Sequence, residues 1–548
     1  MSSQGYLSIL NVYIMRIILL ILFLFVLETV QATDPYPRNE AIDIRHYQFM
    51  LELNDTTNRI AGEATITIRF KKDLTEFELD LTGINRQNLG MIVKEVLQED
   101  QSLKFSHQND RLKIQWRGTA GDEKKIIVRY SGIPQDGLII SNNRFGDRTF
   151  FGDNWPNLAH HWLPTIDHPY DKATCEFIVV APEHYSVIAT GLKVEESTIV
   201  KHRKLTHWKT SVVLPTKVMV IGVAPFAIDY AGEVDGVPLQ SWVYPQNREA
   251  GFSDYAIAGK ILDYFHNNIA PYPYEKLANV QSTTIHGGME NAGNIFYSEK
   301  SVTGKGTIEA LIAHEVAHQW FGDSASEGDW YHVWLSEGFA TYFANLYFEK
   351  TYGRDRLMEE MKSYRRLVID FALKSPTPIV NTTITDIKMV LNTNCYQKGA
   401  WVLHMLRHEV GDQKFWEGIR QYYKQYQLSN ALTDDFMRIM EKVSGKDLKK
   451  FFDQWIFTAG QPNLEVGWKY DPNRKQIKVV VEQLQRALFD FPLEIGINSL
   501  TGTSQVEKIR VSGRKEEFVI PSVQKPTLLS LDPYVWLLFD GNLKESGK

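Results

Sequence analysis

The stretch that decides the fold is His314-Glu315-Val316-Ala317-His318. It lies within residues 307–321, where apolar residues recur at helical spacing, and Gly322 follows as a stop signal. Residues four apart lie one above the other on a helix, so both imidazoles can reach one metal ion. Glu315 projects towards the same side, where a carboxylate can take a proton from a metal-bound water. With 15 histidines and 66 acidic residues in 548 positions, chance predicts roughly 0.05 such pentapeptides, which favours zinc over two solvated histidines.

A catalytic zinc site has three protein ligands and a water, so a third ligand is expected. Glu337 offers a carboxylate, with 18 residues between it and His318, within Trp334-Leu335-Ser336-Glu337-Gly338-Phe339-Ala340. The helical pattern continues from there to Tyr352, where Gly353 closes it. Two helices joined by a short loop can cross and bring Glu337 beside the histidines. The spacing alone fits a surface carboxylate at a helix start equally well.

The chain around this motif predicts a multidomain α+β protein. Residues 33–236 alternate apolar and polar side chains, as in 64–70, which predicts a β-rich N-terminal domain. Residues 237–462 have mostly helical patterns, beginning with 256–268, and contain the metal motif. Alternation returns in 463–548, which predicts a C-terminal β-sandwich domain.

Residues 1–32 are expected to be a signal peptide rather than part of the fold. Arg16 precedes an apolar run of 11 residues, 17–27, and Val30-Gln31-Ala32 is a small-residue cleavage pattern. The run is shorter than the roughly 20 residues that span a bilayer. We therefore expect an exported protein, periplasmic or extracellular, with no stable membrane span. If the segment is not cleaved, a longer stretch from Tyr6 would anchor the chain.

Charge and cysteine content exclude some classes of function. A net charge of -6 and the absence of a basic run argue against a nucleic-acid partner. The two cysteines, Cys175 and Cys395, are too few for a disulfide framework in an exported chain of this size. We expect two separate buried thiols, although the sequence leaves a pairing open. The sequence does not indicate an oligomeric state.

Two further motifs flank the metal motif. Before it stands Gly287-Gly288-Met289-Glu290-Asn291, and after it stands Tyr396-Gln397-Lys398-Gly399-Ala400. In this order, with the H-E-x-x-H pentapeptide and its distant glutamate, the chain resembles the M1 aminopeptidases. The resemblance covers nearly all of the chain after residue 32. It implies an N-terminal β saddle, a thermolysin-like catalytic domain and a C-terminal β-sandwich, without the helical domain that closes over the cleft in family members. A more open cleft, or closure by another subunit, would follow.

The same resemblance implies a set of catalytic roles. One zinc ion per chain would be held by His314, His318 and Glu337, while Glu315 works on the metal-bound water. Tyr396 would donate its hydroxyl to the tetrahedral oxyanion beside the metal. Read without the family, Tyr396 is an ordinary core aromatic.

The resemblance also implies how the substrate is held. Glu290 would bind the free α-ammonium of a peptide, and the backbone at Gly287 and Gly288 would line the chain, because glycines allow close approach. Met289 and Asn291 complete this substrate-binding segment. Read alone, the segment is only a turn signal.

Three positions depart from the common family pattern. Asp153 stands where many members carry a glutamine that helps to hold the substrate N-terminus, and we expect it to bind the ammonium. Ser336 replaces an asparagine and Gly288 an alanine, and neither change removes a group that the chemistry needs.

Other functions stay open at this point. They are a zinc endopeptidase, which the Glu290 motif disfavours, a bifunctional epoxide hydrolase, and a catalytically dead peptide-binding protein. Asp323 is a candidate acceptor for a ligand histidine, or simply an acidic residue at the end of a helix. Four other histidines are expected to have no role in the chemistry: His160, His161, His286 and His332.

Overall fold

The structure is a computed structural model that describes residues 33–200, 202–499 and 502–545. The predicted signal peptide lies outside these described residues. The chain divides into two compact units, Met1–Pro35 and Tyr36–Lys548, and the second contains all the features discussed below. In the described ranges, no helix has both the length and the apolar character needed to cross a bilayer.

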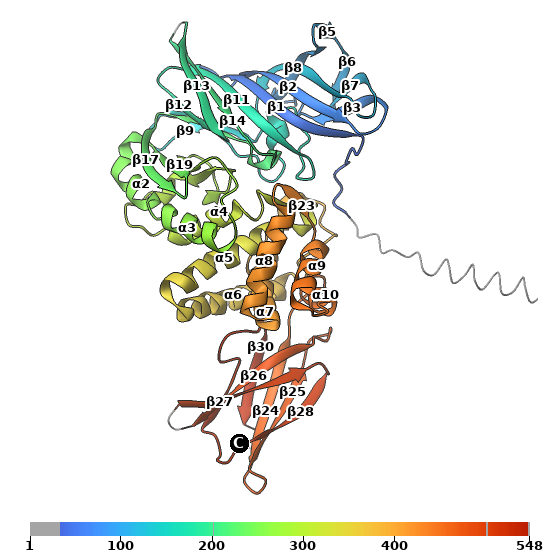
Figure 1. Cartoon of the computed structure of the whole chain (residues 1–548), viewed down its shortest axis with the longest axis vertical. Coiled ribbons are helices and arrows are strands. Elements are labelled where there is room, and N and C mark those ends of the chain that lie inside the picture. Colours follow the sequence, from blue (N-terminus) through green and yellow to red (C-terminus); the bar gives the residue numbers. More distant parts are fainter. Residues whose placement is uncertain (1–32, 201, 500–501, 546–548) are drawn as a thin grey trace, which may run out of the picture. The chain divides into compact units, whose positions relative to one another are not determined.

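The N-terminal part is built from strands, as its alternating pattern predicts. Strand β2 (Ile60–Phe70) buries Ala64, Ile66 and Ile68 on one face, and it pairs with β1 and β8 in the middle of a nine-stranded sheet. That sheet has the order β13-β14-β11-β1-β2-β8-β4-β5, with β15 beside β11. Two smaller sheets have the orders β12-β16-β10-β9 and β3-β7-β6 (Figure 1). The strand bounds are β1 Ile42–Glu52, β3 Leu74–Asp80, β4 Gly90–Gln98, β5 Gln101–Ser102, β6 Lys104–Gln108, β7 Arg111–Gly118, β8 Glu123–Ile133, β9 Leu138–Asn142, β10 Arg148–Gly152, β11 Lys172–Pro182, β12 Ser186–Ala189, β13 Leu192–Ile199, β14 Arg203–Lys209, β15 Leu214–Pro215 and β16 Ile221–Ala224.

The middle part of the chain, which contains the metal motif, begins earlier than the sequence suggests. The predicted boundary at 236 falls in the turn of a hairpin, between β17 (Ala227–Val234) and β18 (Val237–Val243). Both strands belong to a five-stranded sheet of order β17-β18-β19-β21-β20, so the boundary moves to before Ala227. The remaining strands of this sheet are β19 Leu277–Ser282, β20 Gly288–Met289 and β21 Asn294–Ser298.

This part contains nine described α-helices, and the long, buried α5 (Trp334–Tyr352) lies among them. Every residue from Trp334 to Phe348 is buried, which is typical of a helix that is apolar all round and packed on every side. The other helices are α2 Arg248–Tyr255, α3 Ala258–Asn268, α4 Glu309–His318, α6 Arg354–Lys374, α7 Gly399–Val410, α8 Asp412–Tyr426, α9 Thr433–Ser444 and α10 Lys449–Trp455. A short parallel pair, β22 (Ala325–Glu327) with β23 (Ser429–Ala431), ties the α4–α5 connection to the loop before α9.

In its described residues, the C-terminal part is built from strands, beginning with β24 (Asn463–Asp471). Its strands form two sheets, β28-β25-β24-β30 and β27-β26-β29, in the orange-to-red region of Figure 1. The prediction for the cysteines is confirmed, since Cys175 and Cys395 are both buried and unbridged. The other strand bounds are β25 Gln476–Gln483, β26 Phe491–Ser499, β27 Gly502–Val511, β28 Lys515–Pro521, β29 Leu528–Leu531 and β30 Asp540–Glu545.

Candidate metal centre and active site

The structure brings the three predicted metal ligands together. His314 and His318 lie one turn apart on α4, and their Nε2 atoms are 3.0 Å apart. Oε2 of Glu337, from the first turn of α5, lies 3.4 Å from Nε2 of His314 and 3.3 Å from Nε2 of His318. Ligand atoms about 2.1 Å from a tetrahedral ion are about 3.4 Å from one another. This triangle therefore fits a zinc ion with one position left for water.

Two further observations support a cation at this point. Oε2 of Glu337 is buried and has no hydrogen-bond partner, so it is free to ligate. Burial alone would lower the pKa of His318, but the Glu337 and Glu290 carboxylates outweigh it and raise that pKa to about 10. The same negative potential attracts a divalent cation.

The ring of His318 is fixed from behind. Its Nδ1 lies 3.1 Å from the carbonyl oxygen of Phe321 and 3.1 Å from the hydroxyl of Ser336. A proton on Nδ1 leaves the lone pair on Nε2, the nitrogen that faces Glu337. Asp323, one candidate for orienting a histidine, instead accepts a hydrogen bond from Gln319. The sequence drew attention to Ser336 only as a departure from the family pattern.

A cavity of about 80 Å³ opens over the metal triad and collects most of the predicted residues. Glu315, Glu290 and Tyr396 all line it, with Gly288 and Met289. Burial raises the pKa of Glu315 well above its usual range, with Glu290 and Glu337 adding to the effect and His318 opposing it. The ring of Tyr396 stacks on that of His314, with 6.0 Å between the ring centroids. The carboxylates of Glu315 and Glu290 and the side chain of Tyr396 thus line one cavity with the metal triad.

Some residues of the lining were not predicted. Trp155, His286 and Leu391 line the cavity, although His286 was expected to have no role. Their sequence signal was their closeness to predicted residues. Trp155 lies two residues after Asp153, and His286 directly precedes the glycine pair.

Three predicted substrate-binding residues lie outside the described lining: Asp153, Gly287 and Asn291. Asp153 is buried, and its Oδ1 has no hydrogen-bond partner. Burial raises its pKa to about 6, with Asp136 and Glu290 adding to the rise and His286 opposing it. Asp153 therefore lies outside the described cavity wall, near enough to Glu290 and His286 for their charges to affect its pKa.

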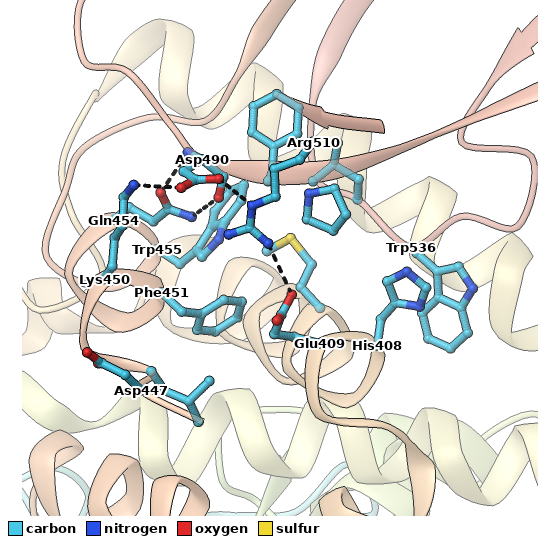
Figure 2. A pocket seen from close by; sticks show the side chains of 15 residues that line it. His408, Glu409, Asp447, Lys450, Phe451, Gln454, Trp455, Asp490, Arg510 and Trp536 are labelled. Carbon is cyan, nitrogen blue, oxygen red and sulfur yellow. Dashed lines mark hydrogen bonds and ion pairs between the residues drawn. The ribbon is translucent and has the colours of Figure 1, made fainter. Parts of the chain in front are cut away.

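A larger cavity, of about 260 Å³, lies elsewhere, between α7, α10 and the C-terminal sheets. Figure 2 shows Asp490 between Lys450 and Arg510, and Trp536 beside His408. Four of its charged side chains pair with one another, namely Lys450, Asp490, Arg510 and Glu409, and its lining includes no member of the metal triad. Its greater volume does not make it the candidate site, because the metal triad lines the smaller cavity.

Comparison with known proteins adds two family matches. The model for the Peptidase M1 N-terminal domain matches residues 44–218, and the model for the Peptidase family M1 domain matches residues 254–455. Together they cover the N-terminal β part and the part with the metal triad.

Curated relatives share this region. The glutamyl aminopeptidase of Bitis rhinoceros is 31% identical over 334 residues, which are 57% of this chain and 34% of that protein. The probable aminopeptidase 1 of Sulfurisphaera tokodaii is 25% identical over 453 residues, 78% of this chain and 55% of that protein. The match spans about a third of the length of the glutamyl aminopeptidases.

A solved structure shares the fold. The M1 zinc metallopeptidase from Deinococcus radiodurans aligns with a TM-score of 0.66 at 24% identity, over 77% of this chain and 95% of that chain.

Proposed function

Since this chain belongs to peptidase family M1, we propose that it is a zinc aminopeptidase that removes the N-terminal residue from peptides. One observation carries the proposal. Glu290 lies close enough to the metal triad to share a ligand cluster with His318, and its Oε1 is buried without a hydrogen-bond partner. A buried, unpaired carboxylate oxygen is costly unless a cation meets it. The α-ammonium of a peptide is such a cation, and binding it there places the first peptide bond at the metal.

Each side chain then has a chemical task. A zinc ion bound by His314, His318 and Glu337 would polarise the scissile carbonyl and lower the pKa of its water. Glu315 accepts the proton of that water and delivers it to the leaving amine.

Tyr396 supplies the hydrogen bond to the developing oxyanion. Burial, together with the negative charge of Glu337, raises the pKa of its hydroxyl far above the usual range, so it stays a donor at every pH at which the enzyme would work.

The finer structural assignments belong to this proposal as well. A thermolysin-like catalytic domain is supported by the order of the α4 motif and the α5 glutamate, and a β-sandwich by the two C-terminal sheets. The exported location predicted from residues 1–32 stays a prediction.

The test compares peptides that differ only at the N-terminus. A panel of short peptides would be digested free and N-acetylated, with chelator and with zinc restored. We expect free peptides to lose one residue at a time and acetylated peptides to resist. Chelator should abolish the cleavage of free peptides, and zinc should restore it. Equal cleavage of both sets would instead indicate an endopeptidase. Glu315→Gln is the control for a contaminating protease, because it should lose turnover and keep its zinc.

A further inference from the structure

Gln319 directly follows the metal ligand His318, and its side chain is completely buried. Its amide nitrogen donates to the backbone oxygen of Glu290 at 2.7 Å and to Oδ2 of Asp323 at 3.1 Å. Its amide oxygen accepts from the backbone N–H of Gly293 at 2.8 Å and from the hydroxyl of Tyr272 at 3.1 Å. Both N–H groups and both lone pairs of the amide are therefore in use.

Two of these four bonds hold one short segment of the chain. Glu290 and Gly293 are three residues apart, and Gln319 binds the backbone of both. The segment is sharply turned, since Gly293 has a φ of +69° and the N–H of Asn294 donates to the oxygen of Asn291. Gln319 thus fixes the segment that carries the Glu290 carboxylate.

On its other side, Gln319 is attached to α4, the helix that carries His314 and His318. One peptide bond separates Gln319 from His318, so the side chain connects the ammonium-binding segment to α4 with no other element between them. A substrate N-terminus held by Glu290 must reach the metal across a single residue. Displacements of about 1 Å in such a geometry cost about 100-fold in rate.

We infer that Gln319 is a positioning residue that sets the one-residue distance between the ammonium subsite and the metal. This role rests on the proposed function, because it needs Glu290 to bind the substrate N-terminus. It predicts that loss of the amide weakens the recognition of free N-termini while the metal stays bound.

Two substitutions separate the contacts. Gln319→Met keeps the length of the side chain and removes all four hydrogen bonds. Gln319→Glu keeps oxygen acceptors for Gly293 and Tyr272 but has no N–H for the backbone oxygen of Glu290. The matched control is Gln281→Met, because Gln281 is also fully buried in this part of the chain. Gln281 accepts from the N–H of Tyr244 at 3.0 Å and lies outside the described lining of the cavity.

The measurements are zinc per chain, thermal midpoint, kcat and KM on free peptides, and the ratio of cleavage of free to N-acetylated peptides. We expect both Gln319 variants to bind one zinc, to raise KM at least tenfold and to lower that ratio at least tenfold. Gln281→Met should lower the thermal midpoint alone.

Two outcomes would overturn the role and leave the proposed function standing. Gln319 variants with the KM and cleavage ratio of Gln281→Met would show that the amide only stabilises the fold. If the Gln319 variants lost zinc in proportion to their loss of activity, Gln319 would instead be a residue that supports the metal site. A wild-type enzyme that does not prefer free N-termini would overturn the proposed function, and this role with it. If the wild-type enzyme prefers free N-termini and the Gln319 variants keep its KM and cleavage ratio, the role is overturned while the proposed function stands.

Discussion

The hydroxyl of Ser336 lies 3.1 Å from Nδ1 of His318. Ser336 directly precedes Glu337, so one turn of α5 provides a metal ligand and orients the ring of another ligand on α4. The contact leaves no room for a side chain at position 322. A Cβ on Gly322 would lie 2.1 Å from the Ser336 hydroxyl and 3.1 Å from Nδ1 of His318. Gly322 also has a φ of +117°, which favours glycine for a second reason.

Ser336→Ala should weaken zinc binding about 10-fold or more, because groups that orient a metal-binding histidine are typically worth about 10–100-fold in affinity. Competition with a chromogenic chelator measures this directly. Ser326→Ala is the control, since the buried hydroxyl of Ser326 donates to the backbone of Asp323 and contacts no ligand. Equal zinc affinity in the two variants would show that the carbonyl of Phe321 orients His318 unaided.

Gly288→Ala should slow the chemical step. A Cβ at this position would lie 2.3 Å from Oε1 of Glu315, so the carboxylate must move away from its place over the glycine. We expect kcat to fall about 10-fold, equivalent to about 1.4 kcal/mol, with a smaller change in KM. Gly83→Ala is the control, because its Cβ would meet nothing closer than 3.8 Å. A Gly288→Ala enzyme with the wild-type kcat would show that Glu315 works from another rotamer.

The proximity of His314 and His318 can be predicted from the sequence because the information is local. A spacing of four residues places His314 and His318 on one face of a helix wherever that helix packs. Predicting the third ligand needed more information. Glu337 comes from a second helix, the buried α5, and how α5 crosses α4 depends on tertiary packing. The family motifs provided that information, and the structure places Glu337 as they imply.

The rest of the cavity depends on contacts that no local pattern contains. Trp155 comes from the N-terminal β part and Leu391 from the chain before the Tyr396 motif, and only tertiary packing brings both to the metal. The misplaced boundary at 236 has a similar cause. Alternation identifies β17 and β18 as strands, but it does not say which sheet their hairpin joins.

Asp153 should make substrate binding depend on pH. Burial raises its pKa to about 6, against the opposing effect of His286, so the carboxylate is ionised above that pH and neutral below it. Ionised Asp153 adds negative potential beside Glu290 and favours the substrate ammonium. KM for free peptides should therefore rise as the pH falls through about 6, and Asp153→Asn should raise KM near neutral pH and remove that rise. His286→Asn should move the rise to higher pH. If KM still rises at the same pH in Asp153→Asn, the rise is caused by the titration of another group.

The N-terminal and catalytic parts are joined by a buried ion pair. Nζ of Lys217, in a short 3-10 helix (Thr216–Val218), lies 2.6 Å from Oε1 of Glu327 on β22. The two side chains are 1% and 0% exposed, and Oε2 of Glu327 has no hydrogen-bond partner. Removing one member of such a pair leaves an uncompensated buried charge, whereas replacing both with apolar groups of similar volume is often neutral.

Lys217→Met should therefore destabilise the protein by about 3–5 kcal/mol, and the double variant Lys217→Met/Glu327→Leu should regain most of that loss. Urea unfolding of the zinc-loaded protein measures both. Lys113→Met is a matched control, because Lys113 lies at the same distance, 2.6 Å, from Glu76 but is 40% exposed, with Glu76 48% exposed. An exposed pair contributes about 0–1 kcal/mol, since water screens both charges. If Lys113→Met cost as much as Lys217→Met, burial would not be what makes the Lys217–Glu327 pair important.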